Sequence, residues 1–238
     1  MRQSRLWWAA LVICVLLLLA VLVLDVMHRL YHTQGVFEPA GHHWFDSDAD
    51  RSMSELIGYL QSLTSSVLLL YFAVAVGKGW TFLVLGQAML VVVLDDYMRL
   101  HEELRGTFID LLGLQGRFGL RSEDIGELMA WAFIGLPIFV AFVLAWKYSR
   151  PEIRKKTKPL LIAVGALIFF AAVIDMFAIL AWQVGIEPGA FGWQGRVYYA
   201  LTMVESLGEL ASQSAILLIA IYLVLQLARK NREAESEE

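Results

Sequence analysis

The chain has 238 residues, of which 58% are hydrophobic and 18% charged, and its mean hydropathy is +0.61. Soluble domains are about half apolar and carry charge on about a quarter of their residues, so this composition excludes an ordinary soluble protein. The formal net charge is −4, and a single cysteine, Cys14, excludes a disulfide framework within the chain.

The apolar segments predict an all-α fold, a polytopic transmembrane helical bundle forming a single domain over residues 1–238. Each segment is long enough to cross about 30 Å of hydrocarbon at about 1.5 Å per helical residue. The first is longer than the roughly 7–15-residue core of a signal peptide and no cleavage motif follows it, so we expect it to remain as a helix. The six expected spans cover residues 6–26, 56–76, 80–100, 125–146, 160–182 and 197–227.

The segments outside the spans complete this prediction. The expected outward loop covers residues 27–55, the cytoplasmic loop residues 147–159, and the cytoplasmic tail residues 228–238. The sequence Gly77-Lys78-Gly79 predicts a tight turn between the second and third spans. The segment 103–124 alternates apolar and charged residues, which is typical either of a short helix in the membrane interface or of a simple connector.

The outward loop contains four of the five histidines and an Asp46-x-Asp48-x-Asp50 run. His28 and His32 stand four residues apart, a spacing that can share a metal if the first helix continues outward. An EF-hand is excluded, because Arg51 occupies the position that requires glycine. We expect this loop to be a solvated interfacial segment.

The basic residues predict the orientation of the chain. With six spans, 12 of the 19 Lys and Arg residues, including every lysine, lie on the side of the termini. The positive-inside rule therefore places both termini in the cytoplasm of a bacterial-type inner (plasma) membrane. Eighteen of the 23 acidic residues fall on the opposite side, and this rule does not explain acids inside the ends of helices, because Asp and Glu contribute little to orientation.

Charged residues end the third span, in the sequence VVVLDDYMRLHEEL over residues 91–104. In a continuous helix, Asp95, Arg99 and Glu102 share one face, Asp96 lies beside it, and His101 points elsewhere. Asp95 and Arg99 are four residues apart, which favours an ion pair between them.

The fifth and sixth spans carry acids at a similar expected depth. Tyr198, Thr202, Glu205, Glu209 and Ser212 form one polar stripe, which must face the interior of the bundle and not lipid. Asp175 lies about 10 Å from the outward end of the fifth span. We therefore expect the acids of the third, fifth and sixth spans to form one layer near the outward surface.

Three explanations of this layer remain open: a structural network with Arg99 and Arg196, carboxylates that hold protons, or a bound cation. The five acids outnumber the nearby arginines, which favours a proton or a metal. Carboxylates with one imidazole suit a divalent metal ion, whose identity the spacing does not indicate. The candidate ligands are Asp95, Asp96, His101, Glu102, Asp175, Glu205 and Glu209.

These residues predict an integral membrane protein with an embedded cation site, used by a metal-dependent enzyme. A proton or cation pathway is the first alternative, and a non-catalytic subunit or assembly factor of a larger complex is the second. The expected partners are the lipid bilayer and either another membrane protein or a second copy of the chain. No nucleic-acid-binding motif is visible.

Overall fold

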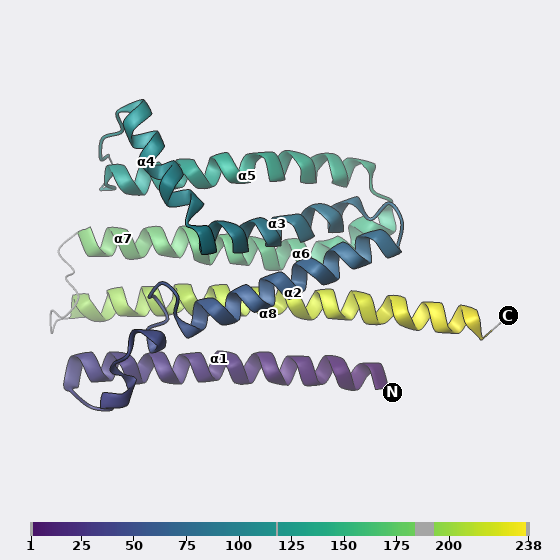
Figure 1. Cartoon of the computed structure of the whole chain (residues 1–238), viewed down its shortest axis with the longest axis horizontal. Coiled ribbons are helices and arrows are strands. Elements are labelled where there is room, and N and C mark those ends of the chain that lie inside the picture. The colour runs from purple at the N-terminus through teal and green to yellow at the C-terminus, as the bar shows by residue number, and fades with distance from the viewer. Residues whose placement is uncertain (1, 118, 184–192, 237–238) are drawn as a thin grey trace. The chain divides into compact units, whose positions relative to one another are not determined.

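The computed structural model describes residues 2–117, 119–183 and 193–236, and it describes side chains for residues 5–117, 119–181 and 197–236. Most of the described residues form helices, and none of them forms a strand, as Figure 1 shows. Six helices in this part of the chain are long and apolar enough to cross a membrane. The prediction of an all-α, multi-pass membrane protein is confirmed, whereas the side on which the termini lie stays a prediction.

The contacts within the chain group into two compact units, residues 1–61 with 159–238 and residues 62–158. The first unit contains α1 (Arg2–Gln34), the first residues of α2 (Met53–Ala75) and α8 (Trp193–Glu235). It also contains most of α6 (Pro151–Ile168), the π-helical segment η3 (Phe169–Ile174) and α7 (Asp175–Gln183). The second unit contains the rest of α2, then α3 (Trp80–Met98), α4 (Leu100–Leu112), α5 (Ser122–Tyr148) and the first residues of α6.

Several helices run further than the apolar pattern predicts. α1 continues eight residues beyond the expected span, α8 continues to Glu235, and α5 and α6 leave only Ser149 and Arg150 between them. The expected cytoplasmic loop 147–159 is therefore mostly helical. Hydropathy locates the residues that can lie in lipid, whereas backbone hydrogen bonds continue a helix through polar residues as well.

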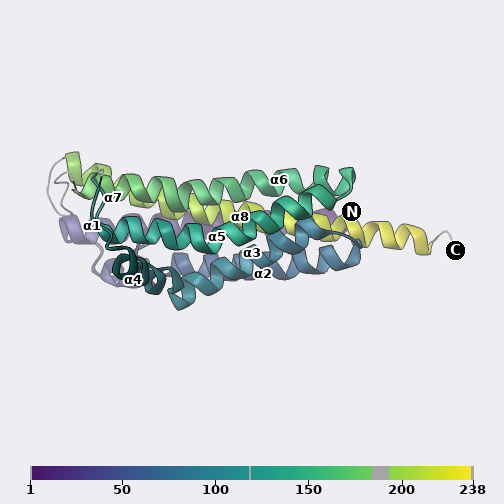
Figure 2. The same ribbon diagram turned by 90° about the horizontal axis from the view of Figure 1, so that it is seen from above.

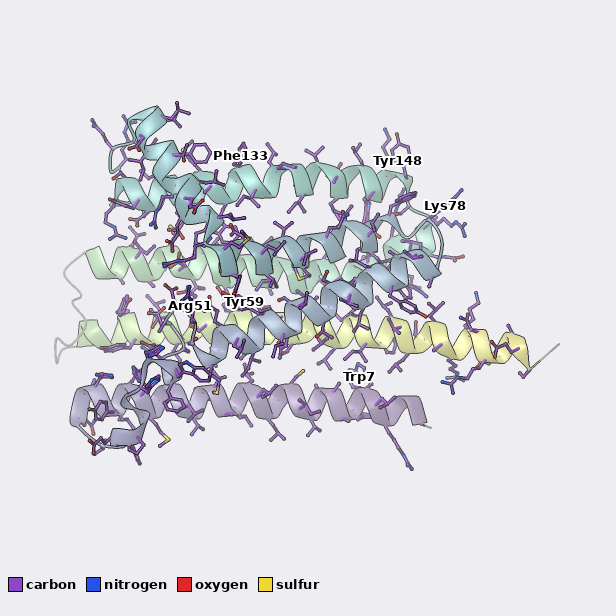
Figure 3. The ribbon with its side chains drawn as sticks, viewed as in Figure 1. Trp7, Arg51, Tyr59, Lys78, Phe133 and Tyr148 are labelled. Carbon is purple, nitrogen blue, oxygen red and sulfur yellow. The ribbon has the colours of Figure 1, made fainter. Side chains whose placement is uncertain are left out.

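In the first unit, α1 lies beside α8 (Figure 1). Near the start of α1, Trp7 donates its indole N–H to the carbonyl of Leu218 at 3.2 Å, and its side chain is labelled in Figure 3. The backbone of Gly208 in α8 approaches Phe170 of η3 so closely that an added Cβ would lie 2.2 Å from the ring. A glycine is required there because any side chain would displace the ring.

A buried carboxylate, Asp25, ties the loop after α1 to that helix. Asp25 is 0% exposed and accepts hydrogen bonds from the backbone N–H and the hydroxyl of Ser47, both at 2.9 Å. Arg29 donates to the same carboxylate at 2.6 Å and lies over the ring of Tyr199. One turn further along, the ring of His28 contacts the carbonyl of Ala40 at 2.8 Å. These contacts anchor the loop, which contains two short 3-10 helices, η1 (Glu38–Gly41) and η2 (His43–Phe45), while most of its side chains stay exposed or half-buried, as expected of a solvated segment.

In the second unit, α2 and α3 form an antiparallel hairpin. The predicted turn is confirmed: Gly77 and Lys78 both have positive φ, at 57° and 58°. The hydroxyl of Ser66 donates to the carbonyl of Gly86 at 2.7 Å, a contact that the small glycine allows. Thr81 of α3 and Thr157 of α6 share a buried hydrogen bond of 2.8 Å.

The segment 103–124 contains a helix, so the helical alternative is confirmed for its first part. α4 lies against the beginning of α5, as Figures 1 and 2 both show. Phe108 of α4 meets Phe133 of α5 edge to face at 5.8 Å, and the Phe133 ring is labelled in Figure 3. At the start of α5, Arg121 is the N-cap, and its N–H donates to the buried carboxylate of Asp124 at 2.7 Å.

We predict that Asp25→Ala lowers the free energy of unfolding by about 3–5 kcal/mol, because it leaves the buried Arg29 without its carboxylate. Thermal unfolding of the purified protein in detergent measures the effect. Glu38→Ala, which removes an exposed carboxylate from the same loop, is the matched control. Equal unfolding temperatures for the two variants would show that Asp25 does not anchor the loop.

Candidate metal centre

The centre of the candidate site is Asp95, in the last turn of α3. Its side chain is 0% exposed, although it lies only three residues before the end of the helix. A buried carboxylate needs hydrogen-bond donors or a positive charge, because removing its hydration without compensation is costly. The following turn supplies the donors.

A break at Arg99 separates α3 from α4. Arg99 adopts the left-handed conformation, with φ 56° and ψ 39°, and its N–H donates to the carbonyls of Asp95 and Asp96. The two helices therefore do not share one axis, as the ribbon in Figure 1 shows. The expectation that one helix continues through residues 99–102 was wrong, and so was the expectation that His101 points away from Asp95.

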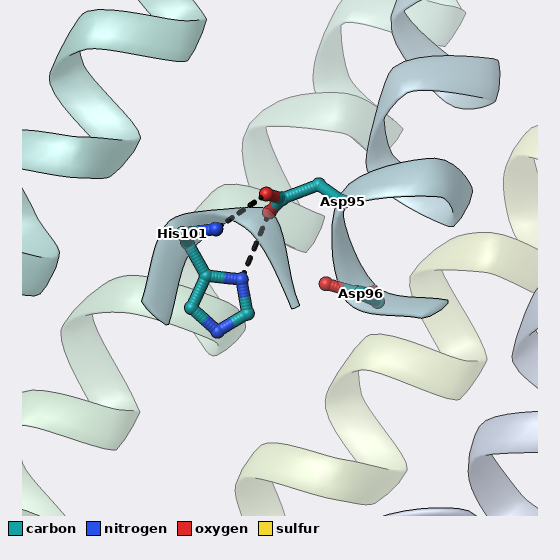
Figure 4. Close-up of side chains that lie close together, drawn as sticks. All are labelled: Asp95, Asp96 and His101. Carbon is teal, nitrogen blue, oxygen red and sulfur yellow. Dashed lines mark hydrogen bonds and ion pairs between the residues drawn. The ribbon is translucent and has the colours of Figure 1, made fainter. Parts of the chain in front are cut away.

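The break turns His101 back onto Asp95. The backbone N–H of His101 donates to one carboxylate oxygen of Asp95 at 2.9 Å, and ring atom Nδ1 lies 3.0 Å from the other. Figure 4 shows both contacts, with the half-buried Asp96 beside them. One potential ligand atom from each of Asp95, Asp96 and His101 lies within 4.8 Å of the others. Two carboxylates and one imidazole are thus brought together by a single turn of backbone.

The other edge of the His101 ring faces α5. Atom Nε2 of His101 lies 3.8 Å from a carboxylate oxygen of Glu127, whose other oxygen lies 3.3 Å from Arg105. The indole of Trp131 stacks on the imidazole, with ring centres 5.2 Å apart and planes 18° apart. These contacts fix the plane of the ring. The sequence pattern did not indicate Arg105 or Trp131, because Trp131 meets His101, and Arg105 meets Glu127, only through the packing of α4 on α5.

This geometry supports two states of His101. In the neutral form with the hydrogen on Nε2, which faces Glu127, the lone pair of Nδ1 points toward Asp95 and can bind a metal together with the carboxylates or accept a proton. In the protonated form, the ring is a cation between the carboxylates of Asp95 and Glu127. The first state corresponds to a metal or acid–base site, and the second to a structural ion network.

The other predicted residues of this segment have different contacts. Glu102 accepts a hydrogen bond from Arg99 at 2.8 Å, and it is not part of the cluster formed by Asp95, Asp96 and His101. In the structure Asp95 contacts His101, whereas the four-residue spacing favoured an ion pair with Arg99. The side chain of Arg196 lies outside the described ones.

The remaining predicted ligands lie in the first unit. Glu205 and Glu209 are one turn apart on α8, and Asp175 begins α7 directly after the π-helical segment. Glu205 interacts electrostatically with Asp175, Glu209 and Asp48, so these acids form a group of their own. The predicted layer contains these acids together with Asp95. Because its residues belong to both units, the layer stays a prediction.

Comparison with known proteins assigns the family of the chain. The model of the family described as "Domain of unknown function (DUF8692)" matches residues 48–225. The chain belongs to this family. The matched region contains Asp95, Asp96, His101 and Glu127 and begins after α1. A search of curated proteins and a search of solved structures found no match.

We predict that Arg99→Val lowers the free energy of unfolding by about 1–2 kcal/mol, because a β-branched residue does not adopt positive φ without strain. Arg99→Gly should be tolerated, since glycine adopts this conformation freely. Met98→Val, at an exposed position one residue earlier, is the control for a change of side chain alone. Thermal unfolding in detergent compares the three, and equal stability of the Val and Gly variants at residue 99 would contradict the turn.

Proposed function

We propose that this protein binds a divalent metal ion through Asp95, Asp96 and His101 and uses it as a membrane-embedded enzyme. The single observation that carries the proposal is the proximity of three potential ligand atoms, within 4.8 Å of one another, at a buried position near the end of a membrane-spanning helix. Ionisable groups in such helices are rare and are often functional.

The donor set fits this use. Two carboxylates and one imidazole neutralise a divalent ion and leave coordination positions for water or substrate, as in catalytic sites with three protein ligands. A metal bound there supplies a polarised substrate oxygen or a water molecule with a lowered pKa. Glu127 faces Nε2 of His101 and can hold a proton beside the site. Under the predicted orientation, the centre opens toward the extracytoplasmic side of the inner membrane.

We predict that the purified full-length protein binds about one equivalent of Mn²⁺ or Zn²⁺, as measured by equilibrium dialysis and elemental analysis. Asp96→Asn and His101→Ala should each weaken binding by at least about tenfold, because each removes a ligand. Asp110→Asn, on the exposed face of α4, is the matched control.

A chain that stays folded yet binds no metal, or binds it equally in the Asp96 and His101 variants, would contradict the proposal. These residues would then have a structural role, as an ion network of Asp95, His101 and Glu127. Circular dichroism and the unfolding temperature of each variant separate lost ligands from lost structure.

A proton or cation pathway is the second candidate, and the first unit supplies its support. Below Glu205 and Glu209, α8 continues with the buried residues Ser212 and Ser214. The hydroxyl of Ser214 donates to Gln61 of α2 at 3.0 Å and also bonds the side chain of Cys14 in α1. Polar groups thus extend from the acids toward the middle of this unit, a feature that a pathway requires.

We predict that, if this second function applies, the protein in liposomes carries a proton or cation flux that Glu205→Gln abolishes. The substitution keeps the size of the side chain and removes its charge. Glu233→Gln, on the exposed end of α8, should leave the flux unchanged. Absence of flux in the wild-type protein would exclude the pathway and leave the metal-dependent enzyme as the interpretation.

A further inference from the structure

A pocket of about 300 Å³ adjoins the candidate metal centre in the second unit. Asp95 contributes to both, which places one buried carboxylate in the pocket wall. Glu103 and Thr107 are the other polar residues of the lining. The rest of the wall is aliphatic and comes from α3, α4 and α5: Val91, Leu100, Leu104 and Ile134.

The pocket extends to the depth of lipid chains. Val91 lies seven residues before the end of α3, and Ile134 lies 12 residues after the start of α5, or about 10 and 18 Å along the helices. Hydrocarbon fills about 30 Å of a bilayer, so the aliphatic part of the pocket lies within it and Asp95 lies nearer the interface. Small-molecule pockets of this kind are mostly apolar with a few polar groups that orient the ligand.

The surroundings give lipid direct access. Leu94, Tyr97 and Met98 on α3 are 44%, 72% and 56% exposed, so the helix presents bare apolar surface beside the pocket. A molecule that enters from the lipid phase can therefore place a chain between Leu104 and Ile134 while its polar end stays near Asp95. The charges restrict this end: two carboxylates, Asp95 and Glu103, repel a phosphate unless a cation lies between them.

We propose that the pocket binds an acyl chain of a membrane phospholipid and that phospholipids are the substrate class of the metal centre. The chain occupies the aliphatic part of the pocket, and the headgroup reaches the metal held by Asp95, Asp96 and His101. This inference rests on the proposed function for its headgroup end, whereas the apolar pocket supports the acyl-chain end by itself.

The test uses full-length protein in phosphatidylcholine vesicles that contain a small fraction of phosphatidylcholine with a photoreactive diazirine in one acyl chain. After irradiation, mass spectrometry locates the labelled peptides. We expect stronger labelling of residues 100–107 than of the segment around Phe139, which is 62% exposed on α5 and lies outside the pocket.

Leu104→Trp should reduce labelling of the pocket by about tenfold, because the larger indole occupies space that the bound chain needs. Thr107→Phe, which narrows the pocket at an exposed position, is a second variant in case Leu104→Trp does not fold. Leu144→Trp, at an exposed position of α5 outside the pocket, is the matched control.

The outcomes separate this inference from the proposed function. Labelling that Leu104→Trp or Thr107→Phe abolishes, with metal binding intact, supports the pocket, and its decrease after chelation by EDTA supports the headgroup at the metal. Labelling that survives chelation supports the acyl-chain site. It contradicts only the part of the inference that places the headgroup at the metal. Labelling at residues 100–107 no higher than around Phe139, or unchanged in both pocket variants, would overturn the inference.

Discussion

The burial of single aspartates near helix ends is the constraint on which both units depend. Asp25 and Asp95 are each 0% exposed in an otherwise apolar helix. A carboxylate in this position is stable only when donors replace its hydration. For Asp25 the donors are Ser47 and Arg29, and for Asp95 they are the backbone and ring of His101. In both cases the buried acid orders the segment that follows its helix, one as an anchored loop and the other as a new helix.

At Asp95 the ordered turn also holds an imidazole in a position where it can act as a ligand or a base. Nδ1 of the imidazole faces Asp95, Nε2 faces Glu127, and the stacked Trp131 holds the plane of the ring. A side chain with a fixed plane and a fixed hydrogen bond on one nitrogen is preorganised as a ligand or a base on the other. The same contacts also suit a protonated histidine in a structural network. Occupancy by a metal is what distinguishes these two roles, because a metal ligand must be deprotonated.

The pocket beside Asp95 connects this chemistry with the membrane. Its aliphatic wall comes from α3, α4 and α5, and its polar residues are Asp95 of α3 and Glu103 and Thr107 of α4. An enzyme that takes its substrate from the bilayer needs an apolar surface for the chain and polar groups for the headgroup. A lipid arrives with its chain in the apolar phase and its headgroup at the interface. The acids of the first unit, Asp175, Glu205 and Glu209, form a second acidic group on α7 and α8. Membership of the DUF8692 family leaves the chemistry of both groups to experiment.

The sequence by itself determined the class of the fold, because runs of apolar residues that span a bilayer leave few alternatives to helices. It also indicated the Gly77–Gly79 turn and the importance of Asp95, Asp96 and His101. It did not reveal the left-handed turn at Arg99, since a non-glycine residue gives no local signal for positive φ. A helix continued through Arg99 therefore predicted that His101 points away from Asp95, whereas the structure directs it toward Asp95. Only the tertiary structure decided the partners of Asp95 and the pocket next to it, because both depend on how α4 packs against α5 after the chain has turned.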